Sequence, residues 1–267
     1  MKPAHVPLTL GVMLLASGAA HAANEAWNSP FTLQIGAFNA RAETTVRLDP
    51  NDRFDGTTIH IENDLGVEDR KTLPDLSFLW RINNRHALEG SWVSLKRDGV
   101  LRITGEIVFG DVTFPISARV DSKFDSDVAR LSYRYSFVND GAGNELAGLL
   151  GVHYTTLKAK ISALDSTLSR EESVEAPLPT IGFRGSWRVA DNWRVSGFAQ
   201  ALKLKIKDID GEILNASATV EWAFTRHAYA GLAYNYYKYK ITSEKERNPG
   251  QFDFRFDGPA LYVGYAF

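Results

Sequence analysis

The last ten residues, 258–267, form the pattern that most constrains the fold. Counting back by twos from Phe267 gives Tyr265, Val263 and Leu261, whereas the other parity gives small residues and a single tyrosine. Because a strand points successive side chains to opposite faces, one face of this segment is bulky and apolar and the other is small. Terminal residues of soluble chains usually fray into water. We therefore expect this strand to turn its apolar face to lipid and to close a sheet.

The first 22 residues have the pattern of a secretory signal peptide. Lys2 supplies a positive start, residues 6–16 form an apolar core, and residues 20–22 (Ala-His-Ala) offer small side chains for cleavage. The apolar run is well short of the roughly 20 residues that span a bilayer as a helix. The sequence therefore predicts a cleaved segment, 1–22, followed by one domain, 23–267. It contains no later apolar run long enough for a helical span.

Composition excludes one class of partner and is neutral on others. The formal net charge of -2 gives no electrostatic reason to expect nucleic acid as a partner. The absence of cysteine fits an oxidising export route. Alternation of apolar and polar residues is typical of a membrane barrel, but a soluble β-sandwich alternates in the same way with its apolar face inward.

Four segments share one arrangement: an aromatic residue, a short polar turn and a second strand, which is the pattern of a hairpin. The aromatic residues before the four turns are Trp80, Tyr135, Trp187 and Trp222. The segments between the hairpins are mostly longer and more polar, above all residues 45–71 and 97–124. The chain therefore alternates short turns at one end with long loops at the other.

The predicted signal peptide, the aromatic-flanked hairpins and the terminal Phe267 together resemble small Gram-negative outer-membrane β-barrels. The resemblance implies an all-β, antiparallel, up-and-down transmembrane barrel in the bacterial outer membrane, with short turns in the periplasm and long loops outside. It also implies contact with outer-membrane lipid and lipopolysaccharide, and recognition of the C-terminal strand by the barrel-assembly machinery. It indicates no particular oligomeric state. The aromatic residues that it places at the membrane interface are Trp80, Trp187, Trp193, Trp222, Tyr265 and Phe267.

A first strand at 31–44 and a last strand at 254–267 add to the four hairpins to predict ten strands. The main alternative concerns residues 100–121, which alternate apolar and polar residues on both sides of Gly110-Asp111. This segment is either an extracellular extension of two strands or an additional membrane hairpin. The second reading gives twelve strands, and eight is a further alternative. The turn lacks a flanking Trp or Tyr, which favours the extension and therefore ten strands.

Strand parity predicts a charged barrel interior. A lipid-facing arginine near the bilayer midplane costs about 2–4 kcal/mol, so arginines on the membrane strands must face inward. The predicted interior cluster is Asp75, Arg81, Glu89, Arg130, Arg134, Arg184, Arg188, Arg194 and Glu221. Buried charge has to be paired or hydrated. The cluster is therefore either an ion-paired filling that stabilises a narrow barrel or the lining of a pore biased toward small anions.

Two enzyme classes occur on small outer-membrane barrels: omptin proteases and lipid A deacylases. After removal of the signal peptide, His86 and His227 fall in periplasmic turns, His60 falls in the first loop, and His153 points inward on the fifth strand. General acid–base or nucleophilic catalysis needs a base within hydrogen-bonding reach of its partner. The sequence shows no motif that resembles either class, so we expect a protein without catalytic residues.

No cofactor is indicated by the sequence. Asp64, Glu68 and Asp69 gather near Gly66, but their spacing does not match an EF-hand loop and a solvated turn explains them better. Three lysines, Lys203, Lys205 and Lys207, alternate with apolar residues where they could contact lipopolysaccharide phosphates. We therefore expect a structural barrel or narrow pore whose surface loops contact lipopolysaccharide or partners. An anion-biased solute channel is the alternative, and an outer-membrane hydrolase is disfavoured.

Overall fold

The computed structural model describes residues 23–50, 56–206, 209–243 and 249–267. The predicted signal peptide, residues 1–22, lies outside the described residues, as does Lys207. Among the described residues, no helix is long and apolar enough to cross a bilayer.

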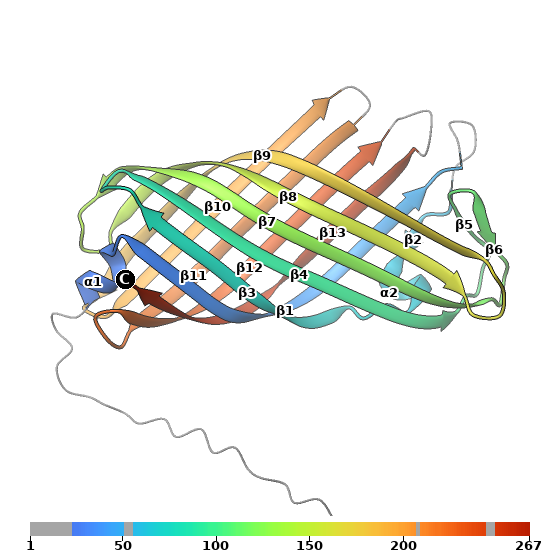
Figure 1. The fold of residues 1–267 in the computed structure, drawn as a ribbon, viewed down its shortest axis with the longest axis horizontal. Helices are drawn as coiled ribbons and strands as arrows, with labels where there is room; N and C mark the ends of the chain where they lie inside the picture. The colour runs from blue at the N-terminus through green and yellow to red at the C-terminus, as the bar shows by residue number, and fades with distance from the viewer. Residues whose placement is uncertain (1–22, 51–55, 207–208, 244–248) are drawn as a thin grey trace, which may run out of the picture.

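Ten antiparallel strands form one closed ring, which confirms the predicted fold class and strand number (Figure 1). Each ring strand pairs with the next one along the chain, and the last pairs with the first from Thr32↔Ala266 to Leu48↔Gly250. The ring strands are β1 (Phe31–Leu48), β3 (Arg70–Arg81), β4 (His86–Arg102), β7 (Arg119–Asn139), β8 (Glu145–Ala163), β9 (Ser169–Ala190), β10 (Trp193–Ile206), β11 (Ile209–Ala223), β12 (Ala228–Ser243) and β13 (Gly250–Ala266).

The remaining elements are short and belong to connections. A helix α1 (Ala23–Asn28) precedes the ring, and β2 (Ile59–His60) with α2 (Ile61–Leu65) lies between β1 and β3. Between β4 and β7, β5 (Ile107–Phe109) and β6 (Val112–Phe114) form a separate two-stranded sheet. The twelve-strand alternative is therefore wrong, because β4 and β7 extend into the segment 97–124 and only this small hairpin remains between them.

The two ends of the barrel differ in the length of their connections. Short turns lie at the end that also holds α1 and the C-terminus, and the longer connections lie at the other end (Figure 1). In outer-membrane barrels the short turns are periplasmic. β7, β8 and β9 have 21, 19 and 22 residues, about twice the roughly 9–11 that span a bilayer. Their wall therefore projects beyond the membrane on the extracellular side.

The outer face of the periplasmic half is an exposed apolar belt. Leu150, Phe183 and Leu261 are each more than 60% exposed although their strands are fully paired there. All six predicted interface aromatics lie on this outer face near the periplasmic end. Toward the long connections, exposed lysines such as Lys96 and Lys158 replace the apolar residues. An apolar exterior around a charged interior inverts the soluble arrangement and is the pattern of a transmembrane barrel.

The interior has two zones. The periplasmic half holds the charged residues, whereas the extracellular half is filled by apolar side chains (a zone termed here the apolar zone). Its buried aromatic residues on the ring strands come from β1, β7, β12 and β13: Phe38, Phe124, Tyr237, Tyr239, Phe254 and Phe256. Apolar residues of the first loop and of the β5–β6 hairpin pack against them. A barrel interior that is polar throughout, as the sequence suggested, is therefore wrong for the extracellular half.

The closing strand does not leave the open interior space that its small residues suggest. A Cβ atom on Gly264 would lie 2.2 Å from the ring of Tyr229, and one on Gly231 would lie 2.3 Å from the ring of Tyr262. These glycines therefore make room for neighbouring aromatic rings.

Candidate functional site

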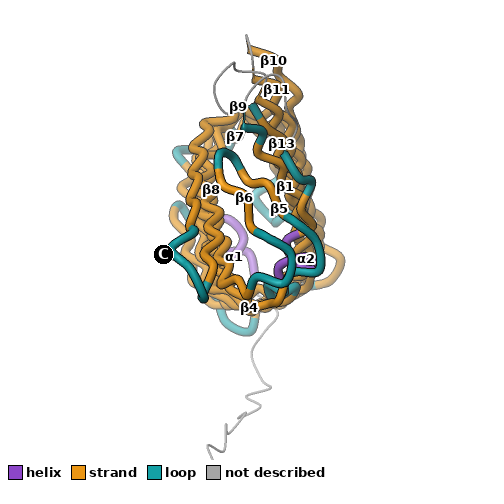
Figure 2. Tube along the Cα trace, turned by 90° about the vertical axis from the view of Figure 1, so that its right-hand side faces the viewer, coloured by secondary structure: helices purple, strands orange, loops and turns teal. Residues whose placement is uncertain are grey.

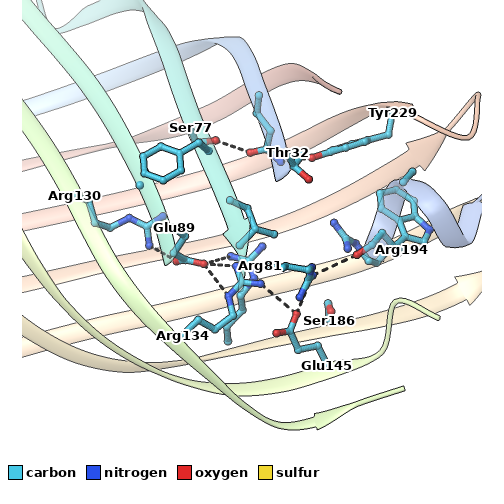
Figure 3. A pocket seen from close by; sticks show the side chains of 17 residues that line it. Thr32, Ser77, Arg81, Glu89, Arg130, Arg134, Glu145, Ser186, Arg194 and Tyr229 are labelled. Carbon is cyan, nitrogen blue, oxygen red and sulfur yellow. Dashed lines mark hydrogen bonds and ion pairs between the residues drawn. The ribbon is translucent and has the colours of Figure 1, made fainter. Parts of the chain in front are cut away.

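The charged zone of the interior is an ion-pair network centred on Glu89 of β4 (Figure 3). Arg130 donates to Glu89 Oε1 at 2.7 Å, and Arg134 donates to Oε2 through Nε at 3.0 Å and through Nη2. Arg184 of β9 approaches the same carboxylate at 3.9 Å. Both arginines on β7 point inward because they share parity with Ser132, which is fully buried. The carboxylate of Glu89 on β4 therefore interacts with three arginines, two from the neighbouring strand β7 and one from β9.

Glu145 is a second centre that the sequence analysis missed. Its Oε2 accepts from Arg134 at 3.2 Å and from Arg81 at 3.4 Å, and Ser136 donates to its Oε1 at 2.5 Å. Glu145 follows the polar turn after Tyr135 closely in the sequence. The turn ends at Asn144, so Glu145 is the first residue of β8 and takes the inward parity of that strand. Counting back by twos from the inward His153 would have found it.

The helix α1 closes the periplasmic end (Figure 2 shows it inside the ring). The indole of Trp27 is 2% exposed and lies 4.1 Å from the guanidinium of Arg194 and 5.2 Å from the ring of Tyr229. Arg194 in turn donates to Glu221 at 2.6 Å. Trp27 therefore occupies the entrance to the charged zone, a placement that no sequence pattern before the first strand had indicated.

The remaining predicted interior residues take separate positions. Asp75 lines a small cavity together with Arg130 and Arg184. Arg188 lies at the periplasmic rim, where it forms an ion pair with Asp191 at 3.5 Å. The structure therefore gathers the other predicted arginines and glutamates near the barrel axis and leaves Arg188 at the edge.

The charged zone contains very little free space. Its two cavities measure about 60 and 80 Å³, and both are lined by Arg130 and Arg184. Since one water occupies about 30 Å³ of the liquid, each cavity holds only a few waters. Arginines outnumber carboxylates around them, so any small ion that reached these cavities would be favoured if it were an anion.

The apolar zone encloses one further ion pair, which ties the first loop to the barrel. Arg97 of β4 donates to Glu62 of α2 at 2.6 Å and to the hydroxyl of Thr44 at 2.6 Å. Its guanidinium lies 5.0 Å from the ring centre of Phe124 and is fully buried. The sequence analysis had assigned Arg97 to a solvent-exposed loop. This contact fixes α2 against the barrel wall and makes the loop part of the filling.

The two histidines considered as catalytic candidates have neutral partners. His153 is fully buried, 3.0 Å from the amide of Asn215 and 3.3 Å from the hydroxyl of Thr180. The Nδ1 atom of His60 lies 3.2 Å from the hydroxyl of Thr45 on the exposed first loop. Neither contact supplies the acidic partner that orients a catalytic histidine. Within the described ranges, no three His, Cys, Asp or Glu side chains gather in a way that could hold a metal ion.

Lys203 and Lys205 lie exposed on the outer face of β10, above the apolar belt. In the β10–β11 register they stand opposite Glu212 and Asp210.

No protein-family model and no curated protein matches this sequence. Several solved structures align with it over most of both chains. The attachment invasion locus protein Ail of Yersinia pestis, in complex with the heparin analogue sucrose octasulfate, is 15% identical, with a TM-score of 0.38 over 89% of this chain and 97% of that chain. The outer membrane protein OprG of Pseudomonas aeruginosa is 14% identical, with a TM-score of 0.36 over 90% and 97%. The toluene transporter TodX of Pseudomonas putida is 7% identical, with a TM-score of 0.38 over 89% and 90%.

These superpositions are loose, so nothing about solutes or partners is carried over from them. The closed ring of ten strands, with its lipid-facing belt and charged interior, makes this chain a small outer-membrane β-barrel protein.

Proposed function

We propose that this protein is a closed, non-enzymatic outer-membrane barrel that acts as a structural and surface-binding element rather than as a standing channel. One observation carries the proposal: the lumen is blocked twice in succession. Trp27 and the ion-pair network close the periplasmic half, and the apolar zone closes the extracellular half.

The apolar zone is the stronger of the two barriers to ions. The rings of Tyr237 and Phe256 stack with centroids 4.5 Å apart, and Phe256 lies 6.0 Å from Phe38 on the neighbouring strand. An ion that entered this zone would lose its hydration without gaining a polar partner, and such transfer is strongly unfavourable. Hydrophobic constrictions gate channels for the same reason.

The excess of arginine around the two small cavities supports an anion-biased channel as the second candidate. That function requires the apolar zone and α1 to open, since both lie in the way. The two candidates therefore differ in one measurable property, which is conductance of the unmodified protein.

We expect no steady single-channel current when the protein without residues 1–22 is placed in a planar lipid bilayer. The triple variant Trp27→Ala, Phe38→Ala, Phe256→Ala should leak ions and favour anions over cations, because three rings are removed from the two barriers while the arginines remain. Phe183→Ala is the matched control, since this equally large ring faces lipid. A steady, anion-selective current through the unmodified protein would contradict the closed barrel and support the channel.

We further propose that the outer face of β10 contacts the phosphates of lipopolysaccharide through Lys203 and Lys205. Reversing both charges (Lys203→Glu with Lys205→Glu) should lower the lipopolysaccharide that copurifies with the barrel several-fold, because Coulomb attraction becomes repulsion. Arg226→Glu makes the same kind of change in a periplasmic turn and should leave copurification unchanged. Equal amounts of lipopolysaccharide on the double variant and on the unmodified barrel would rule out this contact.

A further inference from the structure

A third and much larger cavity, of about 370 Å³, lies at the extracellular end of the apolar zone. Six ring strands and the β5–β6 hairpin contribute apolar side chains to its wall. Six of these side chains are Val46, Phe109, Phe124, Leu157, Ile241 and Phe252. Phe124 and Phe252 stack with an interplanar angle of 14°, so their rings form a flat aromatic part of the wall. The volume lies in the range of cavities that enclose small molecules, about 300–1,000 Å³.

The charged side chains at this cavity are already engaged within the protein. Arg47 pairs with Asp49 at 3.0 Å, and Glu172 pairs with Arg170. Glu175 accepts a hydrogen bond from Tyr154 at 2.5 Å. The ion pairs neutralise Arg47 and Glu172, and Glu175 has the outward parity of Phe183, so the inner wall of the cavity offers an occupant apolar surface. The chemistry of the wall therefore fits an uncharged molecule.

Val174 is an apolar side chain of the cavity wall that remains exposed to solvent. It lies on β9 with the inward parity of Thr180 and lines the cavity, yet it remains 44% exposed. Apolar cavities do not hold ordered water well, because water there finds no hydrogen-bond partners. An occupant that covered Val174 and the partly exposed ring of Phe252 would remove apolar surface from water, which is favourable.

Two neighbouring strands of the barrel wall, β9 and β10, stop pairing beside this cavity. Pairing between β9 and β10 ends at Ile181↔Ala201, although β9 continues to pair with β8 as far as Ser169. Pro177 and Pro179 lie on β9 just beyond the last pair, on its extracellular side, and have no N–H to donate. The backbone N–H groups of alternate residues point to the same neighbouring strand, so Pro177 and Pro179 lack a donor on the same side of β9. The other side of β9 is paired with β8 along this segment. The free edge of β9 therefore faces β10, and Figure 1 shows the two strands diverging from this point.

Glycine permits the close approach at Gly182, one residue before pairing ends. A Cβ atom on Gly182 would lie 2.0 Å from the backbone oxygen of Ala199, so no larger residue fits there. The two strands therefore pack tightly up to Gly182 and separate above it, within a few residues. No residue of the described parts of β10 or β11 lines the cavity, which is bounded by β9 on one side and by β12 and β13 on the other.

We propose that this cavity is a binding site for an uncharged, hydrophobic molecule of about the size of two to three aromatic rings, which enters beside the free edge of β9. The site goes beyond the closed barrel, because a molecule bound here need not cross the lumen. The size follows from the volume, the lack of charge from the engaged side chains, and the apolar character from Val174 and the partly exposed ring of Phe252.

The test uses the barrel in lipid nanodiscs and the uncharged fluorescent probe N-phenyl-1-naphthylamine. We expect a saturable rise in emission with one site per barrel, above the linear background of empty nanodiscs. Val174→Trp fills the cavity from its exposed side chain and should weaken this saturable binding at least tenfold. Lys158→Trp is the matched control, because it adds the same bulk to the outer face of the adjacent strand, opposite Ser173.

Val174→Asp provides a second variant, since it needs no added room and places a charge in the apolar wall. It too should weaken saturable binding at least tenfold, provided that the variant keeps the electrophoretic mobility of a folded barrel before heating. The absence of a saturable component in the unmodified barrel, or unchanged affinity in both Val174 variants, would overturn the site. Conductance of the same preparations tests the closed lumen separately, so the two proposals can fail independently.

Discussion

Replacement of Glu89 by glutamine is expected to destabilise the folded barrel by about 3–5 kcal/mol, the usual loss when one partner of a buried ion pair is removed. Glu89 accepts from Arg130 and Arg134 and also neutralises Arg184, while its own side chain is 4% exposed. Glutamine keeps the shape of the side chain but removes the negative charge that Arg130, Arg134 and Arg184 share. Of these three, Arg134 keeps an ion pair with Glu145. The measurement is the free energy of unfolding from urea titration in lipid vesicles.

Glu175→Gln is the control for this prediction. Glu175 is also hydrogen-bonded, to Tyr154, but the contact is exposed, and exposed charge interactions contribute about 0–1 kcal/mol. A loss below about 1 kcal/mol for Glu89→Gln would mean that water in the two small cavities already screens the arginines. The ion-pair network would then be a hydrated lining, and the anion-biased channel would gain support.

Strand parity was the strongest source of information in the sequence, because the bilayer penalises errors of parity. Ile181, Phe183 and Trp187 alternate with Arg184 and Ser186, and a shift by one residue would place an arginine in lipid. This constraint acts on every membrane strand at once. It indicated which charges face inward, whereas the number of strands came from the four aromatic-flanked hairpins and the two terminal strands.

The same reasoning failed where the strands leave the membrane. Phe254 and Phe256 have inward parity, but the expectation of a polar interior concealed their role as filling. The length of the bilayer no longer constrains β7, β8 and β9 beyond the belt, so both faces of those segments can be built for packing. The first loop follows the same logic, since α2 is held in the lumen by the buried pair Arg97–Glu62.

Two further features depend on contacts that have no local pattern. Trp27 precedes the first strand and is separated by more than 150 residues in the sequence from Arg194 and Tyr229, so only the closed ring brings them together. The cavity at the extracellular end combines residues of seven strands in the same way. Pro177, Pro179 and Gly182 were nevertheless visible in the sequence, and alternate prolines on one strand can be read as an unpaired edge.

Replacement of Val263 by arginine is expected to destabilise the barrel by about 2–4 kcal/mol, the range for a lipid-facing arginine near the bilayer midplane. Val263 lies on β13 with its side chain 52% exposed on the outer belt, between Leu261 and Tyr265. It pairs with Ile35 on β1, so the substitution tests the seam that closes the ring. Unfolding in vesicles of phospholipid measures the effect, and Val263→Leu, which keeps an apolar side chain, should change stability by less than about 1 kcal/mol.

Depth provides the decisive comparison. Tyr265 lies on the same face two residues closer to the periplasmic end, so Tyr265→Arg should lose less from its charge, because the penalty falls to about 0–1 kcal/mol near the interface. Equal losses at both positions would mean that the C-terminal strand does not cross the hydrocarbon in the orientation assigned here. A larger loss at Val263 than at Tyr265 would place the last residues of the chain at the periplasmic interface, where the barrel-assembly machinery is predicted to recognise them.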